Sequence, residues 1–102
     1  MIGVRLPKAV LKAVDDAVLC WLATTGPDGA PNVSPKELFH AEGDAAILIA
    51  DVASPVSRAN VAATGRACLS FVDVFAQRGF KVDAAARYVS CDTADFATVS
   101  AE

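Results

Sequence analysis

The amino-acid sequence predicts a mainly β domain with two or three short helices, arranged as a small closed or nearly closed β-barrel. The predicted elements follow the order helix, three strands, helix, two strands, which lacks the regular strand–helix alternation of a doubly wound fold. Several of the predicted strands are apolar on both faces. A barrel wall explains such strands, because its inner face meets a filled interior and its outer face meets helices or a second subunit.

Length, charge and composition indicate a single domain over residues 1–102. Nine Lys and Arg residues stand against twelve Asp and Glu residues, which disfavours nucleic acid as a partner because phosphate binding needs an excess of positive charge. No apolar run approaches the ~20 residues of a membrane span, and the N-terminus lacks a secretory signal pattern, so we expect a cytoplasmic protein. Hydrophobic residues make up 54% of the chain, and we expect part of this high share to lie in a subunit interface.

The first half of the chain is expected to form a helix and three extended segments. Pro7 fits the first turn of the helix, and a Gly-Pro-Asp-Gly turn at residues 26–29 indicates a hairpin. Pro31 and Pro35 cannot donate to a strand ladder, which places their segment at an edge or beside a bulge. The expected elements are a helix over residues 7–16, a strand enclosed on both faces over 17–25, and further extended segments over 30–40 and 45–50.

The second half contains a helix with both ends marked. Ser54 suits the N-cap, Pro55 the first helical position and Gly65 the stop. Apolar and polar side chains alternate from Phe80 to Val89, so one face of that strand is expected to be buried. The expected elements are a helix over residues 54–64, strands over 67–74 and 80–89, and a tail over 92–102 that can begin a third helix.

No metal site or catalytic residue is predicted. Cys20, Cys68 and Cys91 lack the spacing of a zinc or redox site and are expected to be buried small hydrophobes, and His40 is the only histidine. Paired carboxylates, a Ser-His-Asp set, an activated Cys-His pair and a glycine-rich dinucleotide motif are all missing from the sequence. Any redox chemistry therefore requires a bound cofactor.

Ser54, Ser57 and Arg58 put two hydroxyls and a guanidinium in the first turn of a predicted helix. The unpaired backbone N–H groups and the helix dipole favour an anion there, and a phosphate would fit. An ordinary N-cap with a solvent-facing arginine explains the same residues without a ligand.

Asn32, Ser34 and Lys36 alternate along one extended segment and so share one face. They are expected either to form the polar wall of a site or to belong to a solvated edge strand that its lysine protects. If this segment pairs with residues 45–50, the helix that follows brings Arg58 near Lys36 and makes a two-cation site for one phosphate.

Arg78 and Gly79 belong to a third group, residues 77–81, between two predicted strands. A glycine there permits a bulge or a close backbone approach, and its neighbours carry hydrogen-bond donors. An ordinary turn explains the same composition.

The order of these groups resembles that of the pyridoxamine 5'-phosphate oxidase-related FMN-binding split-barrel proteins. The resemblance is carried by LATTGPDGAPNVSPK at 22–36, IADVASP at 49–55, and SFVDVF at 70–75 leading into QRGFKV at 77–82. It covers roughly residues 6–89 and implies a split β-barrel homodimer that binds flavin mononucleotide (FMN) in two equivalent clefts at the subunit interface.

The resemblance also implies three groups of FMN contacts. The group that lines the flavin ring and ribityl chain and reaches the phosphate is Asn32, Val33, Ser34 and Lys36. The group that holds the phosphate at the helix N-terminus is Ser54, Ser57 and Arg58. The group that comes from the second subunit and meets the flavin edge is Arg78 and Gly79.

The sequence departs from the family pattern at three points. Oxidases of the family continue with further strands, so either the native C-terminus extends beyond residue 102 or the chain is a minimal member, and true pyridoxamine phosphate oxidation is not expected. Ala84 stands where relatives often have Gly, and Asp51 stands near the position at which the oxidases offer a hydroxyl to the phosphate.

The function expected from the sequence is that of an FMN-binding flavoprotein, a small oxidoreductase whose electron donor and acceptor are unknown. One alternative is a carrier that holds a flavin, haem or other small ligand without turnover. Another is a structural protein in which the cleft is empty and only dimerisation remains.

Overall fold

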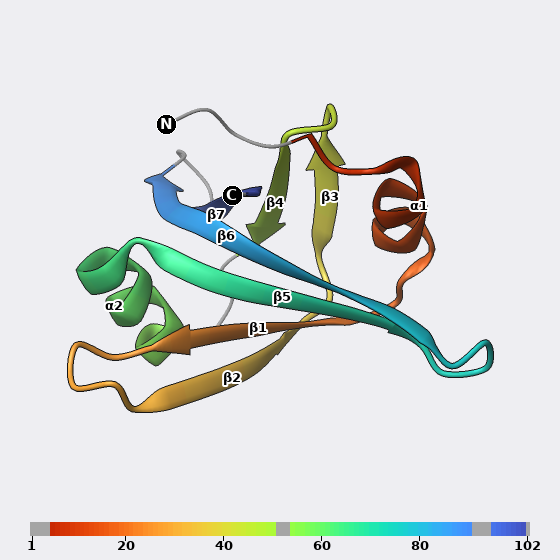
Figure 1. Cartoon of the computed structure of the whole chain (residues 1–102). Helices are drawn as coiled ribbons and strands as arrows, with labels where there is room; N and C mark the ends of the chain where they lie inside the picture. The colour runs from red at the N-terminus through yellow and green to blue at the C-terminus, as the bar shows by residue number, and fades with distance from the viewer. Residues whose placement is uncertain (1–4, 51–53, 91–94, 102) are drawn as a thin grey trace.

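The computed structural model describes residues 5–50, 54–90 and 95–101 and shows seven strands and two helices in them (Figure 1). The helices are α1 (Lys8–Asp16) and α2 (Pro55–Thr64). The strands are β1 (Cys20–Thr25), β2 (Pro31–Lys36), β3 (Phe39–Glu42), β4 (Ala46–Ala50), β5 (Arg66–Asp73), β6 (Arg78–Ser90) and β7 (Asp95–Ala101). The predicted mainly β class is confirmed.

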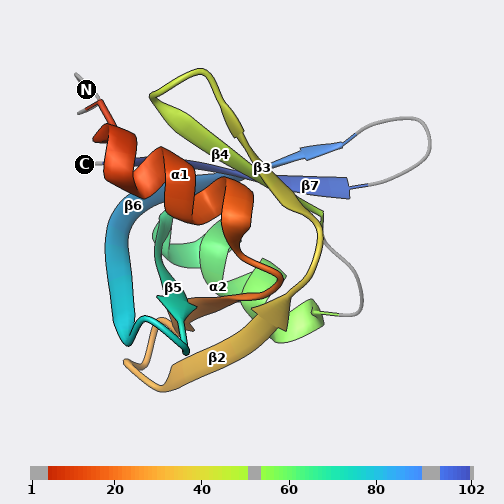
Figure 2. The same ribbon diagram turned by 90° about the vertical axis from the view of Figure 1, so that its right-hand side faces the viewer.

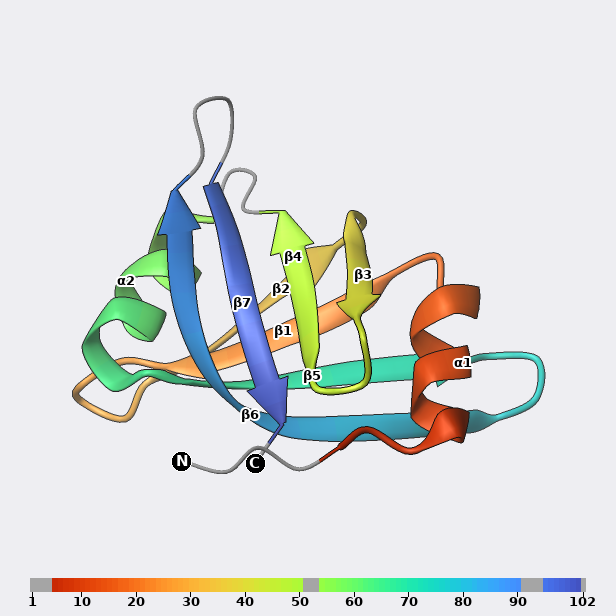
Figure 3. The same ribbon diagram turned by 90° about the horizontal axis from the view of Figure 1, so that it is seen from above.

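The strands form one antiparallel sheet in the order β2-β1-β5-β6-β7-β4-β3. The 13-residue strand β6 pairs with β5 along its first part and with β7 along its second part. Because β6 bends between these two parts, the sheet folds over on itself into two layers (Figure 3). The result is a split barrel whose free edges are β2 and β3.

Apolar side chains from both layers and both helices fill the interior. Phe71 is 1% exposed and meets the ring of Phe39 edge to face, with the ring centroids 5.5 Å apart. Helix α1 packs against β3, β5 and β6, while α2 packs against β1, β2 and β6. The two helices therefore lie at opposite ends of the barrel (Figures 1 and 2).

The local signals for the hairpin turn and for the position of both ends of α2 are confirmed, whereas the first helix begins at Lys8 and Pro7 precedes it in an extended conformation. In the hairpin turn, the Gly26 N–H donates to the Ala30 carbonyl at 2.9 Å, and the Ala30 N–H donates to the Asp28 carboxylate at 3.1 Å. Pro55 opens α2, and Gly65 ends it in the left-handed conformation with φ 69°. Only glycine adopts that backbone conformation without a steric penalty.

The segment expected to be one strand over residues 30–40 is instead two strands. β2 ends at Lys36 and pairs with β1, whereas β3 begins at Phe39 and pairs with β4. The chain crosses from one edge of the split barrel to the other at this break. The predicted pairing of this segment with residues 45–50, which was to bring Lys36 near Arg58, is therefore wrong for β2. Strand β2 nevertheless reaches α2 through side-chain contacts, among them the hydrogen bond from Lys36 to Ser54.

The tail forms a strand, so the prediction of a third helix is wrong. β7 lies between β4 and β6 in the sheet, with its central Val99 opposite Ile47 on one side and Ala86 on the other. A strand in this position satisfies its backbone groups on both edges. The β-branched residues Thr98 and Val99 suit the strand conformation.

Strand β1 is enclosed on one face only, which corrects the expectation of a strand enclosed on both faces. Its inward side chains Cys20 and Leu22 are 0% and 1% exposed, but Trp21 between them is 45% exposed. Buried and more exposed residues alternate in the same way along β5 and β6. The outer faces of β1, β5 and β6 are therefore partly exposed in the single chain. No helix in the described part of the chain is long and apolar enough to span a bilayer.

Candidate functional site

The contact between α2 and the β1–β2 hairpin is made by polar side chains. Residues three apart on a helix and two apart on a strand fall on one face of each element, which brings the two sets of side chains together. This polar seam consists of Thr24, Asn32, Ser34 and Lys36 from the strands and Ser54, Ser57 and Asn60 from the helix and its N-cap.

Ser57 is the centre of the polar seam. Its side chain is 1% exposed, the Asn32 amide donates to its hydroxyl oxygen at 3.1 Å, and the hydroxyls of Ser34 and Ser57 are 2.9 Å apart. A serine hydroxyl has one proton to donate and two lone pairs. When the Ser57 hydroxyl donates this hydrogen bond to the Ser34 oxygen, the Ser34 hydroxyl can donate its own hydrogen bond to a ligand.

Lys36 brings a buried positive charge to the start of α2. The residue is 4% exposed, and its ammonium donates a hydrogen bond to the hydroxyl of Ser54. Within the described residues no carboxylate forms an ion pair with it. A buried ammonium is costly without a counter-charge, so this position favours an anion.

The first turn of α2 adds further anion-binding groups. The Arg58 N–H donates to the Ser54 carbonyl at 3.0 Å, so the preceding amides of Val56 and Ser57 have no partner within the helix. The positive end of the helix dipole lies at the same place. The exposed Arg58 guanidinium lies over the ring of Tyr88, 5.4 Å from the ring centroid, which orients the cation beside the first turns.

Thr24 and Asn60 belong to the polar seam but were not found from the sequence. The Asn60 amide donates to the Thr24 hydroxyl at 3.1 Å, and the residues are 7% and 4% exposed. Asn60 lies one turn beyond Ser57 on the same helix face, and Thr24 lies opposite Asn32 in the hairpin. The three-residue spacing of Ser54, Ser57 and Asn60 was the signal that could have indicated this pair.

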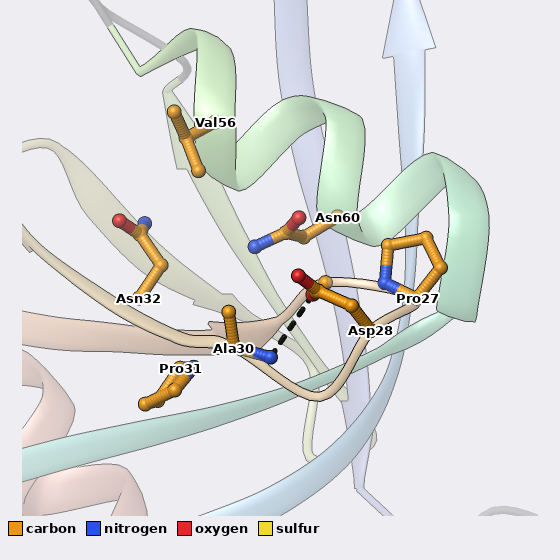
Figure 4. Close-up of a pocket in the computed structure, with 8 residues that line it drawn as sticks. Pro27, Asp28, Ala30, Pro31, Asn32, Val56 and Asn60 are labelled. Carbon is orange, nitrogen blue, oxygen red and sulfur yellow. Dashed lines mark hydrogen bonds between the residues drawn. The ribbon is translucent and has the colours of Figure 1, made fainter.

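A hollow of about 400 Å³ lies beside the polar seam, between the hairpin turn and α2. Asn32, Asn60 and Val56 line it together with Pro27 and Pro31 of the hairpin (Figure 4). The hollow is open to the surroundings and shares Asn32 and Asn60 with the seam. It therefore extends the candidate site rather than forming a separate one.

Val33, Arg78 and Gly79 lie outside the polar seam. Val33 is 57% exposed and points to the face of β2 opposite to that of Asn32. Arg78 begins β6 in the hairpin that lies at the end of the molecule away from α2 (Figures 1 and 3). A Cβ on Gly79 would lie 2.8 Å from the Phe71 carbonyl oxygen, which confirms the expected close backbone approach.

Cys20, Cys68 and His40 take no part in the polar seam. Cys20 is 0% exposed, and burial raises the pKa of its thiol to about 12. Cys68 is only half-buried; its thiol pKa is raised first by burial and then by a hydrogen bond with Asp83. His40 is exposed, and the described residues hold no cluster of metal ligands. Cys91 and Asp51 lie outside the described residues.

A family model and several solved structures resemble the chain. A sequence model described as pyridoxamine 5'-phosphate oxidase matches residues 6–102. No protein with curated functional information matches the sequence significantly.

Solved structures share the fold at low sequence identity. A putative pyridoxamine 5'-phosphate oxidase from Lactobacillus delbrueckii is 19% identical, with 96% of this chain and 91% of that chain covered and a TM-score of 0.86. An FMN-binding protein from Syntrophomonas wolfei is 11% identical, with 93% and 84% covered and a TM-score of 0.75. HutZ, the heme storage protein from Vibrio cholerae, is 17% identical, with 97% and 92% covered and a TM-score of 0.70.

Proposed function

Because the chain belongs to the pyridoxamine 5'-phosphate oxidase family, we propose that it is an FMN-binding flavoprotein that holds the flavin at the interface of a homodimer and acts as a small oxidoreductase. FMN supplies the electron-transfer chemistry when it is bound. The residues of the chain bind and orient the cofactor.

The observation that carries the proposal is the buried ammonium of Lys36 beside Ser54 at the N-terminus of α2. A phosphate monoester is an anion with several acceptor oxygens, and it would provide the counter-charge that Lys36 lacks within the described residues. The amides of the first helical turn and the Arg58 guanidinium would supply further donors. The donor set therefore fits a phosphate.

Strand β2 is proposed to carry the rest of the cofactor. As an edge strand, it leaves one row of backbone groups open, so a ligand lying along the edge can contact Asn32, Val33 and Ser34 although their side chains alternate in direction. Ser57 is buried beneath this strand and would act as a positioning residue that holds the Asn32 and Ser34 side chains.

A second copy of the chain is proposed to complete the site. Arg78 and Gly79 are the first residues of β6, in the β5–β6 hairpin that lies at the end of the molecule away from α2 (Figure 1), so a contact between them and a flavin at the polar seam requires another protomer. The half-exposed Trp21 on the outer face supports such an assembly, because aromatic residues of this kind are enriched in protein interfaces.

A carrier that holds flavin or haem without turnover is the second candidate, favoured by the structural similarity to HutZ. Steady oxidation of NADH or NADPH by the flavin-loaded protein would argue against a carrier. Binding of FMN without such turnover would favour it over the oxidoreductase.

The test is a titration of the purified chain with FMN and, in parallel, with riboflavin, followed by flavin fluorescence. We expect saturable binding of FMN and much weaker binding of riboflavin, which lacks the phosphate. Arg58→Ala should weaken FMN far more than riboflavin, whereas Arg5→Ala, which removes an 86% exposed side chain, should change neither. Equal weakening of both ligands by Arg58→Ala would contradict the phosphate role.

A further inference from the structure

Tyr88, the only tyrosine of the chain, lies in the second part of β6, which packs against α2. The Ala86 N–H donates to the Gly65 carbonyl at 2.9 Å, and this bond fixes β6 to the C-terminal end of the helix. Two residues further along the strand, the Arg58 guanidinium lies over the ring of Tyr88, with its carbon Cζ 5.4 Å from the ring centroid. The strand thus contacts the end of α2 at which a phosphate is proposed to bind.

The ring is the fixed member of this contact. Tyr88 is half-buried and packs against the hydrophobic core, and its backbone pairs with that of Ala97 in β7. Arg58 is exposed, and a long side chain of this kind loses much rotamer entropy when one conformation is selected. The contact therefore orders the arginine rather than the tyrosine.

Arginine can contact an aromatic ring and a phosphate at the same time. The face of its planar guanidinium stacks on the ring, whereas the N–H groups at its edge match the oxygens of a phosphate. A side chain that is ordered before the ligand arrives also binds it more tightly, because less entropy is lost on binding. A ring beneath the guanidinium would therefore strengthen a phosphate contact that it does not itself make.

We propose that Tyr88 is a positioning residue that holds Arg58 in place for the ligand phosphate and so helps to set the preference for FMN over riboflavin. This role rests on the proposed function, in which Arg58 contacts the phosphate. The face of the ring carries the effect, because its negative quadrupole attracts the cation. The hydroxyl of Tyr88 is not needed for it. A residue that only fills space would instead be replaceable by any apolar side chain of similar size.

The test is the ratio of the riboflavin and FMN dissociation constants, measured by flavin fluorescence on the full chain. Tyr88→Leu should lower this ratio about 2- to 5-fold, which corresponds to an exposed cation–π contact of about 0.5–1 kcal/mol, and should leave riboflavin affinity unchanged. Tyr88→Phe should keep the ratio of the unaltered chain. The matched control Phe39→Leu removes another half-buried ring from the core, in β3. It should lower the stability to urea without changing the ratio.

A double-mutant cycle shows whether Tyr88 acts through Arg58. In a chain that carries Arg58→Ala, the further change Tyr88→Leu should have no effect on the ratio, because the cation that the ring positions has been removed. An equal effect of Tyr88→Leu with and without Arg58 would overturn the proposal. A loss in Tyr88→Phe as large as that in Tyr88→Leu would also overturn it.

A ring-fluorinated phenylalanine at position 88 gives a second test that does not depend on the folding of Tyr88→Leu. Fluorine withdraws electrons from the face of the ring and weakens its attraction for a cation, while the ring stays close to its original size. The ratio should fall relative to that of Tyr88→Phe, and an unchanged ratio would overturn the role of the ring.

The unaltered chain and Arg58→Ala separate this proposal from the proposed function. If the unaltered chain does not prefer FMN, or if Arg58→Ala keeps the preference, the phosphate role of Arg58 is contradicted and the role of Tyr88 with it. A preference that requires Arg58 but survives both Tyr88→Leu and ring fluorination would contradict the role of Tyr88 alone.

Discussion

The ammonium of Lys36 donates a hydrogen bond to the hydroxyl of Ser54, inside the contact between β2 and the first turn of α2. This one contact excludes two simple interpretations of the sequence. Lys36 is not the solvated lysine of an edge strand, because it is 4% exposed. Ser54 occupies the N-cap position, but its side chain forms no capping hydrogen bond to the helix.

Replacement of Lys36 by methionine should separate ligand binding from stability. Lys36→Met keeps the length of the side chain and removes a buried charge, which is often neutral or stabilising by about 1–4 kcal/mol in a folded protein. We expect FMN affinity to fall about 100-fold, since a charge-assisted contact of this kind is worth about 1.5–3 kcal/mol. Urea unfolding and FMN titration measure the two effects. Lys8→Met in α1, at an exposed position, should leave both unchanged, and a large loss of stability in Lys36→Met would show that the charge serves the fold.

Removal of the Ser57 hydroxyl should weaken binding without selectivity for the phosphate. Ser57→Ala leaves the Asn32 amide and the Ser34 hydroxyl without their common partner, which costs about 1–3 kcal/mol of stability in a buried site. FMN and riboflavin should then lose affinity to a similar degree, because Ser57 positions β2 side chains. A loss confined to FMN would instead show direct contact between Ser57 and the phosphate.

Thr24 and Asn60 should be coupled in stability. Thr24→Val keeps the shape of the side chain but leaves the buried Asn60 amide unpaired, and we expect unfolding free energy to fall by about 1–3 kcal/mol. Asn60→Leu and the double variant complete a double-mutant cycle, in which the double variant should lose less than the sum of the single ones. Thr25→Val, at the exposed neighbouring position, is the control and should have little effect. Additive losses would contradict the coupling.

The two halves of the polar seam, on β2 and at the start of α2, could be predicted from the sequence. The contact between the two halves could not. Asn32, Ser34 and Lys36 share a strand face by spacing alone, and the start of α2 follows from Ser54 and Pro55. The contact between these two elements depends on packing across about twenty residues of chain, which no local pattern contains. Asn60 was missed because its three-residue spacing from Ser57 is a weak signal, which a solvated polar residue in the second helical turn can also show.

Two of the errors in the fold, the helical tail and the single strand over residues 30–40, have the same origin. The tail has a plausible helix cap, and its strand conformation depends on two partners, β4 and β6, that are distant in sequence. The break after Lys36 likewise depends on which strand each half pairs with. Strand identity was therefore predictable where alternation was strong, as in β6, and unpredictable where only tertiary pairing decides.

Cys20 should make the folded chain sensitive to alkaline pH. Burial raises the pKa of its thiol to about 12, although the nearby Lys36 lowers it, whereas a thiol in the unfolded chain titrates near ~8.5. Between these values the unfolded chain has released the proton that the folded chain retains. The stabilising contribution is thus complete below the unfolded pKa, and as the pH rises toward the folded pKa it is lost at up to about 1.4 kcal/mol per pH unit. Urea unfolding at a series of pH values measures this slope.

Cys20→Ala should be less stable at neutral pH because of the cavity that it leaves, but its stability should fall less steeply above the unfolded pKa. Since all other titrating groups, Cys68 included, are common to both proteins, identical slopes would show that Cys20 does not retain its proton in the folded state.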